Sequence, residues 1–214
     1  YETGQYGWSN QDKDKINAEK TTSFDIGYET YFDALDLGFN ITYFDILIKD
    51  PIIGSNKTNF QDNVPGAENK SKGIELATNW TDNKKLGIDF NYTLTRSYSG
   101  NDCDKPDRDK WGQTSCNASD NKFLKNAMVR VPIHAIGSRI KYQFNKNLKS
   151  SLRLTYKGQT RDYGGTDYSF KDQILDDYLL VDLASTYVLS ENYKIDFSLK
   201  NLFDQNHENS LDYS

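Results

Sequence analysis

The residue types best suited to acid–base or nucleophilic chemistry are sparse in this sequence. It contains two histidines: His134 stands beside Pro132 at the start of a predicted strand, and His207 lies near the end of the sequence. Neither has a convincing nucleophile partner of the kind that catalytic pairs require. We therefore predict no catalytic residues and no enzymatic activity.

The cysteines and the densest acidic stretch lie in one polar segment. Calcium prefers several oxygen ligands at regular spacing, but NDCDKPDRDK lacks the EF-hand pattern and includes bases. We interpret it as a solvated loop, and we predict no metal site and no cofactor. Cys103 and Cys116 form no CxxC pair. They are either free thiols or a disulfide that closes a surface loop in an oxidising compartment, and we favour the disulfide.

The composition is polar and aromatic at once. Of the 214 residues, 36% are hydrophobic, 14% are aromatic and the formal net charge is −5. Acids and bases are interspersed, which argues against nucleic-acid binding because such proteins carry a basic stripe. No apolar stretch approaches the ~18 residues of a membrane helix.

Alternation of apolar and polar residues recurs along most of the sequence. In LGIDFNYTL, for example, Leu86, Ile88 and Phe90 alternate with glycine, aspartate and asparagine. This period of two predicts strands with two unlike faces. We expect eight of them, near residues 23–30, 35–43, 73–80, 86–94, 136–144, 152–158, 180–189 and 193–203.

The predicted connections alternate strictly between short and long. Short turns follow the first, third, fifth and seventh strands, whereas long segments near 50–66, 97–126 and 159–177 follow the second, fourth and sixth. All short turns then lie at one edge of an antiparallel sheet and all long loops at the other. This arrangement is typical of an outer-membrane barrel.

The aromatic residues support a membrane barrel over a soluble sheet. Several lie near the short turns, where a membrane interface attracts aromatic side chains. These are Tyr31, Phe32, Trp80, Tyr142, Phe144, Tyr187 and Tyr193. We predict an all-β, antiparallel, up-and-down transmembrane barrel segment. Two alternatives remain open: a complete eight-stranded outer-membrane barrel with a structural or adhesive role, and a soluble secreted β-sandwich binding module.

Four motifs, in order and in strand phase, resemble those of TonB-dependent outer-membrane receptors. The last is Asn-Leu-Phe-Asp at residues 201–204, after a strand, a turn and another strand. The others are Glu19, Lys20 and Thr21 before Gly27, Tyr28 and Glu29; Lys72, Gly73 and Glu75; and Arg130, Pro132 and His134. Ala18 and Ile133 depart from residues common in the family, and YKGQTRDYG resembles a segment of cobalamin-receptor-like members.

The resemblance implies a barrel of 22 strands around an N-terminal plug domain. Residues 1–214 would form part of the barrel, without the plug and the last strand; the strand near 193–203 would run outward into a loop, before a returning strand. The implied function is uptake of a ferric siderophore, haem or cobalamin across the outer membrane, energised by TonB. The expected partners are outer-membrane lipid, a metal-chelate or cobalamin-like ligand, the receptor's own plug, and TonB through parts outside this chain.

Two groups of residues are the candidates for binding. Polar-face charges are expected to line the lumen and to hold a plug of complementary charge. The alternative is that these charges have no such role, because a water-filled lumen accommodates charged side chains. They are Asp25, Glu29, Asp36, Glu75, Asp89, Arg139, Lys141, Arg153 and Lys157. Loop residues suited to ligand contact are Trp111, Arg161, Tyr163, Tyr168 and Phe170.

Overall fold

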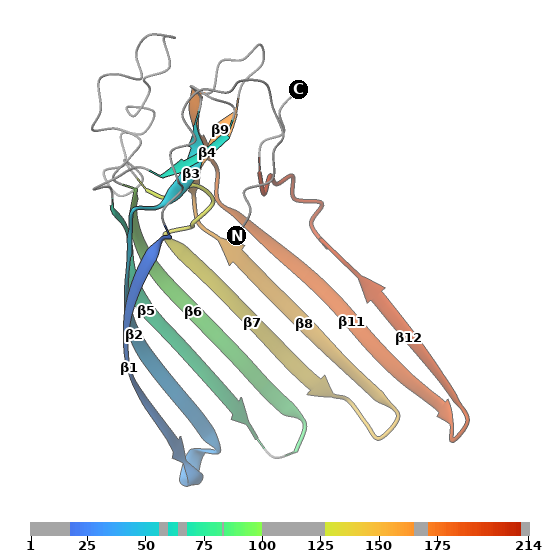
Figure 1. The fold of residues 1–214 in the computed structure, drawn as a ribbon. Coiled ribbons are helices and arrows are strands. Elements are labelled where there is room, and N and C mark those ends of the chain that lie inside the picture. The colour runs from blue at the N-terminus through green and yellow to red at the C-terminus, as the bar shows by residue number, and fades with distance from the viewer. Residues whose placement is uncertain are drawn as a thin grey trace.

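A computed structural model describes residues 18–55, 60–63, 68–82, 84–99, 127–164 and 171–210. They form one eight-stranded antiparallel sheet and two small hairpins (Figure 1). The strands of the large sheet, in their spatial order, are β1 (Lys20–Phe32), β2 (Leu37–Lys49), β5 (Glu68–Thr81), β6 (Leu86–Ser99), β7 (His134–Gln143), β8 (Leu148–Lys157), β11 (Tyr178–Ser190) and β12 (Tyr193–Leu199). The prediction of eight antiparallel strands is confirmed.

The connections also alternate as predicted. Short turns at one edge of the sheet join β1 to β2, β5 to β6, β7 to β8 and β11 to β12; the first contains the 3₁₀ helix η1 (Asp33–Leu35). The long connections lie at the opposite edge (Figure 1), which we call the loop edge. Two of them carry short hairpins that the alternation did not predict: β3 (Ile52–Ser55) with β4 (Phe60–Asn63), and β9 (Thr160–Gly164) with β10 (Lys171–Leu175).

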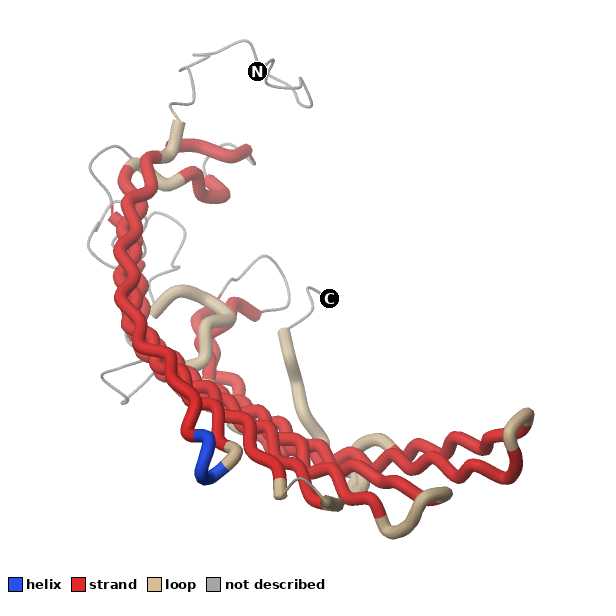
Figure 2. The backbone as a smooth tube through the Cα atoms, turned by 90° about the horizontal axis from the view of Figure 1, so that it is seen from below, coloured by secondary structure: helices blue, strands red, loops and turns tan. Residues whose placement is uncertain are grey.

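The sheet is strongly curved, and its edge strands β1 and β12 do not meet (Figure 2). The segment after β12 lies on the inner side of the curve (Figure 2). That segment contacts Lys157 and Tyr178 through Asn209, so these two side chains mark the concave face. The strand register then assigns every other strand residue to the concave or the convex face.

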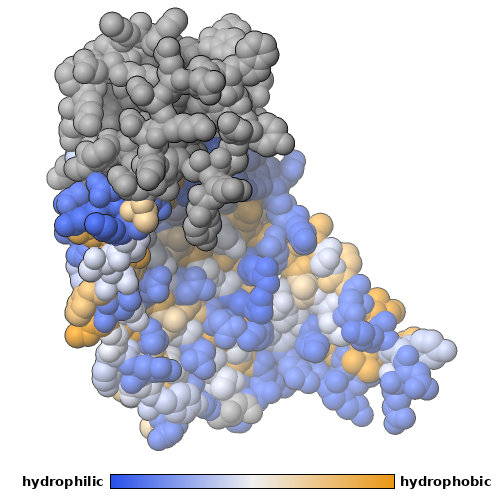
Figure 3. Space-filling view, in the orientation of Figure 1, coloured by the Kyte–Doolittle hydropathy of each residue, from blue (hydrophilic) through white to orange (hydrophobic). Residues whose placement is uncertain are grey.

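The concave face is polar and the convex face is apolar. One concave row contains Gly27, Thr42, Glu75 and Thr93, whereas the adjacent convex row contains Ile26, Tyr43, Ile74 and Leu94. Hydrophilic side chains also spread across the middle of the sheet in Figure 3. This separation is the pattern of a membrane barrel wall, with lipid on one side and water on the other.

The convex face leaves large apolar side chains exposed. In β1, Phe24 is 58% exposed, and Ile26 and Tyr28 are each 61% exposed. A soluble β-sandwich would cover such a face with a second sheet, because an exposed apolar surface of this extent is unfavourable in water. Within the described residues there is no second sheet of that size. The fold therefore disfavours the β-sandwich alternative.

Glycines allow close packing on the concave face. Gly73 lies opposite Phe44 in the β2–β5 register. A Cβ atom at Gly73 would stand 2.7 Å from Cζ of Phe44 and would also clash with the backbone oxygen of Leu94. The Phe44 ring thus covers the glycine in the way that aromatic side chains commonly protect strand glycines.

Three further details differ from the sequence predictions. Tyr31 lies on the concave face with Gly27, so it does not belong to the lipid-facing aromatic group. Asp36 lies in the turn after η1, not within a strand, and has a φ of 52°. The last strand ends at Leu199 instead of Phe203. In the described part of the chain, no helix combines the length and apolar character needed to cross a bilayer.

Candidate functional site

The sheet register brings most of the predicted lumen charges onto one face. Eight of these nine residues lie on strands, and all eight project from the concave face. The strand residues are Asp25, Glu29, Glu75, Asp89, Arg139, Lys141, Arg153 and Lys157. The carboxylates come from β1, β5 and β6, and the cations come from β7 and β8. The concave face therefore has an acidic side and a basic side, as the sequence predicts.

The acidic and basic sides meet at β6 and β7. Asp89 is the register partner of Arg139, but its carboxylate forms an ion pair with Lys141 instead, with 2.6 Å between Nζ and Oδ2. Both side chains are about half exposed, so this surface ion pair contributes little to stability in itself, on the order of 0–1 kcal/mol. Its structural consequence is that Asp89 does not pair with Arg139.

Two arginines stand side by side on the basic side. Arg139 of β7 and Arg153 of β8 are register partners, and Asp182 of β11 lies beyond Arg153 in the same row. Asp182 accepts a hydrogen bond from the backbone N–H of Asn201 (2.9 Å). Within the described residues, neither arginine has a hydrogen bond or an ion pair. Like charges placed opposite one another are unfavourable unless an anion lies close to them.

The predicted lumen position of Asp36 is corrected to a position in the turn. Its left-handed backbone closes η1, since its N–H donates to the carbonyl oxygen of Asp33 (3.3 Å). Tyr31 donates its hydroxyl hydrogen to Asp36 Oδ1. The alternating pattern placed Asp36 in a strand. Aspartate tolerates positive φ and begins turns readily, but an alternation of apolar and polar residues does not distinguish a turn aspartate from a strand aspartate.

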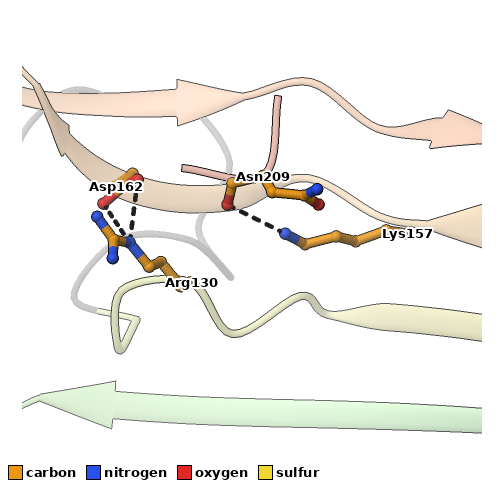
Figure 4. Close-up of polar contacts among 4 residues, drawn as sticks. All are labelled: Arg130, Lys157, Asp162 and Asn209. Carbon is orange, nitrogen blue, oxygen red and sulfur yellow. Dashed lines mark hydrogen bonds and ion pairs between the residues drawn. The ribbon is translucent and has the colours of Figure 1, made fainter. Parts of the chain in front are cut away.

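At the loop edge, an ion pair fixes the start of the β9–β10 hairpin. Arg130 Nε donates to Asp162 Oδ1 (3.1 Å) and Oδ2 (3.2 Å), as Figure 4 shows. The backbone N–H of Arg130 also donates to the carbonyl oxygen of Arg161 (2.7 Å). The residues that precede β7 are thereby attached to β9.

The structure buries one of the predicted ligand-contact residues and leaves three of them outside the described residues. Arg161 is 2% exposed and donates from Nη1 to the carbonyl oxygen of Ala127 (2.7 Å). Its buried guanidinium therefore connects the start of β9 to the segment before β7. This position is not that of a surface contact for a ligand. The backbone of Tyr163 pairs with Asp172 in the β9–β10 hairpin. Outside the described residues lie Trp111, Tyr168 and Phe170, and also Cys103 and Cys116.

The segment after β12 crosses the concave face near the loop edge. The Tyr178 hydroxyl donates to Asn209 Oδ1 (2.5 Å), and Lys157 Nζ donates to the Asn209 carbonyl oxygen (3.4 Å; Figure 4). The rings of Tyr178 and His207 also lie close together, with 4.8 Å between centroids. Lys157, a predicted lumen residue, is thus in contact with this segment.

The sequence motifs identify one residue of each of two contacts but not its partner. The Arg-x-Pro-x-His motif identified Arg130 and His134 but not their partners, Asp162 and Tyr92. The Tyr92 hydroxyl lies 2.9 Å from His134 Nδ1. Both partners are separated from the motif by more than thirty residues. A local pattern does not reveal such pairs, because only the strand order brings them together.

An open, curved antiparallel sheet with a lipid-compatible convex face and a charged concave face defines the wall of an outer-membrane barrel. The family model described as "TonB dependent receptor-like, beta-barrel" matches residues 1–202. The chain belongs to this family, whose members are transport receptors and not enzymes, and membership places it in the outer membrane.

Similar proteins come from three bacteria. The iron-regulated outer membrane virulence protein of Vibrio cholerae serotype O1 is 25% identical over 144 residues, which are 67% of this chain and 19% of that protein. The ferric-catecholate import receptor Fiu from Escherichia coli K12 has a TM-score of 0.67 at 16% identity, covering 97% of this chain and 27% of Fiu. The ferric yersiniabactin uptake receptor FyuA from Yersinia pestis has a TM-score of 0.66 at 17% identity, covering 91% and 26%. The chain thus spans about a fifth of its curated relative.

Proposed function

We propose that this chain forms part of the barrel wall of a receptor that takes up a ferric chelate across the outer membrane. The observation that carries the proposal is the division of the sheet into an exposed apolar face and a charged concave face. The names of Fiu and FyuA favour a ferric chelate over haem or cobalamin as the ligand. The family name supports TonB as the source of energy.

In this proposal, the concave face surrounds a plug domain of the full-length receptor. The paired arginines Arg139 and Arg153 would face acidic groups of the plug, and Glu29 and Glu75 would face basic groups. Charges in a packed interface are costly without partners, which is the physical reason to expect complementary charge on the plug. TonB would act on the plug rather than on this part of the wall.

The long loops would supply the first contact with the ferric chelate. Loops carry binding residues on a rigid scaffold in many proteins, and large aromatic side chains are effective anchors. Trp111, Tyr163, Tyr168 and Phe170 remain the proposed contacts. Arg161 would act indirectly, by holding the base of the loop that contains three of them.

Growth under iron limitation tests the proposal. The full-length receptor would be expressed in cells that lack their own ferric-chelate receptors, with a catecholate chelate as the only iron source. We expect growth that needs both the receptor and an intact TonB. Growth with TonB deleted would contradict the energy source, and failure to bind or use any of a panel of ferric chelates would contradict the ligand class.

A further inference from the structure

A recess in the concave face lies where the sheet approaches the edge of the short turns, opposite the loop edge. Its volume is about 380 Å³. Its polar side chains come from β7, β8, β11 and the residue before β6, and the strand register places them on the concave face. They include Lys85, Arg139, Lys141, Gln143, Lys149 and Thr186. We call this feature the inner recess.

Small residues form the floor of the inner recess. Ser151 of β8 and Ala184 of β11 are register partners and line it, and Gly87 of β6 belongs to the same row. The neighbouring rows on the same face carry long side chains, among them Arg139 on one side and Lys149 on the other. Successive rows are about 7 Å apart. A hollow therefore forms above the small residues, and long polar side chains surround it.

Cations dominate the rim of the inner recess. Lys141 forms the ion pair with Asp89, at 2.6 Å. The other three cations are Lys85, Arg139 and Lys149. Within the residues that the structure describes, none of these three forms an ion pair. Cations that are crowded around one hollow repel one another, and an anion placed between them would relieve that repulsion.

The carboxylates beside the inner recess are engaged in other contacts. Asp196 of β12 accepts a hydrogen bond from the Thr186 hydroxyl (2.7 Å) and pairs with Lys194 Nζ (3.2 Å). It also attracts Lys149 electrostatically. Asp82 accepts hydrogen bonds from backbone N–H groups of its own turn. Even with Asp89 and Asp196 counted, the four cations of the rim leave an excess of positive charge.

We propose that the inner recess is a second, weak binding site for an anionic ferric chelate, which occupies it as it leaves the lumen at the turn edge. The inference rests on the uptake function proposed above. Catecholate or carboxylate donors carry more negative charge in total than iron(III) neutralises, so such a chelate complements the rim. The volume lies in the range of small-molecule sites, about 300–1,000 Å³.

The lysines of the rim suit a transient contact. Lysine is a compact charge on a flexible stem, so it attracts an anion without demanding a fixed geometry. A solute that must pass through needs binding strong enough for entry and weak enough for release. Lys85 and Lys149 also lie one row nearer the turn edge than the floor, whereas Arg139 and Arg153, which we assign to the plug, lie one row nearer the loop edge. The two roles therefore fall on different residues.

Iron uptake by the full-length receptor tests the proposal. Cells without other ferric-chelate receptors would receive a radioactive ferric catecholate, and both binding at the cell surface and uptake would be measured. We expect Lys85→Gln with Lys149→Gln to lower the maximal rate of uptake roughly threefold to tenfold, since each exposed charge contributes modestly. Surface binding and the half-saturating concentration should stay unchanged, because the loops make the first contact.

Two variants serve as controls. Lys84→Gln with Lys146→Gln removes the same charge from exposed turn positions that do not line the inner recess, and uptake should remain normal. Lys85→Arg with Lys149→Arg keeps both charges and should retain uptake, which separates loss of charge from loss of folding. Equal maximal rates in the unmodified receptor and the Lys85→Gln, Lys149→Gln variant would overturn this proposal alone.

Two other outcomes would also overturn the inference, each for a different reason. No uptake by the unmodified receptor would contradict the proposed function and, with it, the second site. Increased entry of large antibiotics into cells that carry the Lys85→Gln, Lys149→Gln variant would mean that these lysines hold the plug instead of the chelate. Reduced uptake with unchanged antibiotic entry and unchanged surface binding is the result that supports the second site.

Discussion

Arg130 and Asp162 are joined by two hydrogen bonds from a single nitrogen, Nε, at 3.1 and 3.2 Å. Asp162 is 1% exposed, whereas the Arg130 side chain remains half exposed. The pair connects the segment before β7 to the first residues of β9. Together with the Arg130 N–H bond to the Arg161 carbonyl oxygen and the Arg161 bond to Ala127, this contact joins the base of the β9–β10 hairpin to the segment before β7.

Asp162→Asn should loosen the loop base. The amide has less affinity for the guanidinium than the carboxylate has, and hydrogen bonds to charged groups contribute about 1.5–3 kcal/mol. We expect a lower free energy of unfolding and faster proteolysis within residues 160–175 of the full-length receptor. Limited proteolysis followed by mass spectrometry measures the second effect.

The control for this prediction is Asp176→Asn. Asp176 is exposed in the same connection, and its contact with Gln159 Nε2 is long, at 3.5 Å. This variant should be cleaved at the rate of the unmodified receptor. If both variants are cleaved alike, the Arg130–Asp162 pair does not hold the loop.

Gly73→Ala should destabilise the barrel. The added Cβ would meet the Phe44 ring at 2.7 Å, and it would also meet the backbone oxygen of Leu94, which cannot move aside as a flexible side chain can. Overpacking of this kind costs about 1–3 kcal/mol. The measurement is the temperature at which the full-length receptor loses its compact migration in SDS gel electrophoresis, which should fall.

Gly87→Ala, also on the concave face, should not destabilise the barrel. The nearest atom to a Cβ at Gly87 is the Trp80 carbonyl oxygen at 3.8 Å, an ordinary contact distance. Alanine also restricts the unfolded chain more than glycine does, so this substitution should be neutral or slightly stabilising. A fall of the same size in both variants would show that crowding at Gly73 is not the cause.

The alternating pattern predicted the strands and their faces because both depend on local sequence. In LGIDFNYTL, for instance, the period of two matches β6 and places Asp89 on the concave face. The same pattern gave no information on which charges would pair. Asp89 binds Lys141 instead of its register partner Arg139, and this choice depends on the reach of flexible side chains across two strands.

Left-handed backbone explains why the sequence misplaced the end of the last strand. Asn201 and Asp204 have φ values of 51°, and the backbone N–H groups of Asn201 and Leu202 donate to Asp182 and Val181 of β11. The Asn-Leu-Phe-Asp motif therefore forms a turn held against β11. Its apolar Phe203 is in phase with Ile195, Phe197 and Leu199, so the period of two alone extended β12 too far.

The turn between β5 and β6 should depend on the charge of Asp82. Hydrogen bonds from the backbone N–H groups of Leu86, Lys84 and Lys85 lower the pKa of this carboxyl group below its ordinary value. A lowered folded-state pKa contributes stability above the unfolded value, near pH 4, and that stability is lost as the pH falls through the folded pKa. Asp82→Asn should therefore reduce the decline in unfolding free energy between pH 5 and pH 3. An unchanged slope in denaturant titrations at these pH values would refute the role of Asp82.

Arg139→Glu combined with Arg153→Glu tests whether the basic side of the concave face holds the plug. Reversal would place two glutamates between Asp89 and Asp182 in one row, so it should add repulsion within the wall and should also repel an acidic plug surface. We expect a looser plug in the full-length receptor, seen as increased entry of large antibiotics into cells and as faster hydrogen exchange in the plug. Lys84→Glu with Lys146→Glu makes the same change in net charge at exposed turns and should leave entry unchanged. Unaltered antibiotic entry in the arginine variant, with normal amounts of receptor in the membrane, would mean that the concave charges face water and do not hold the plug.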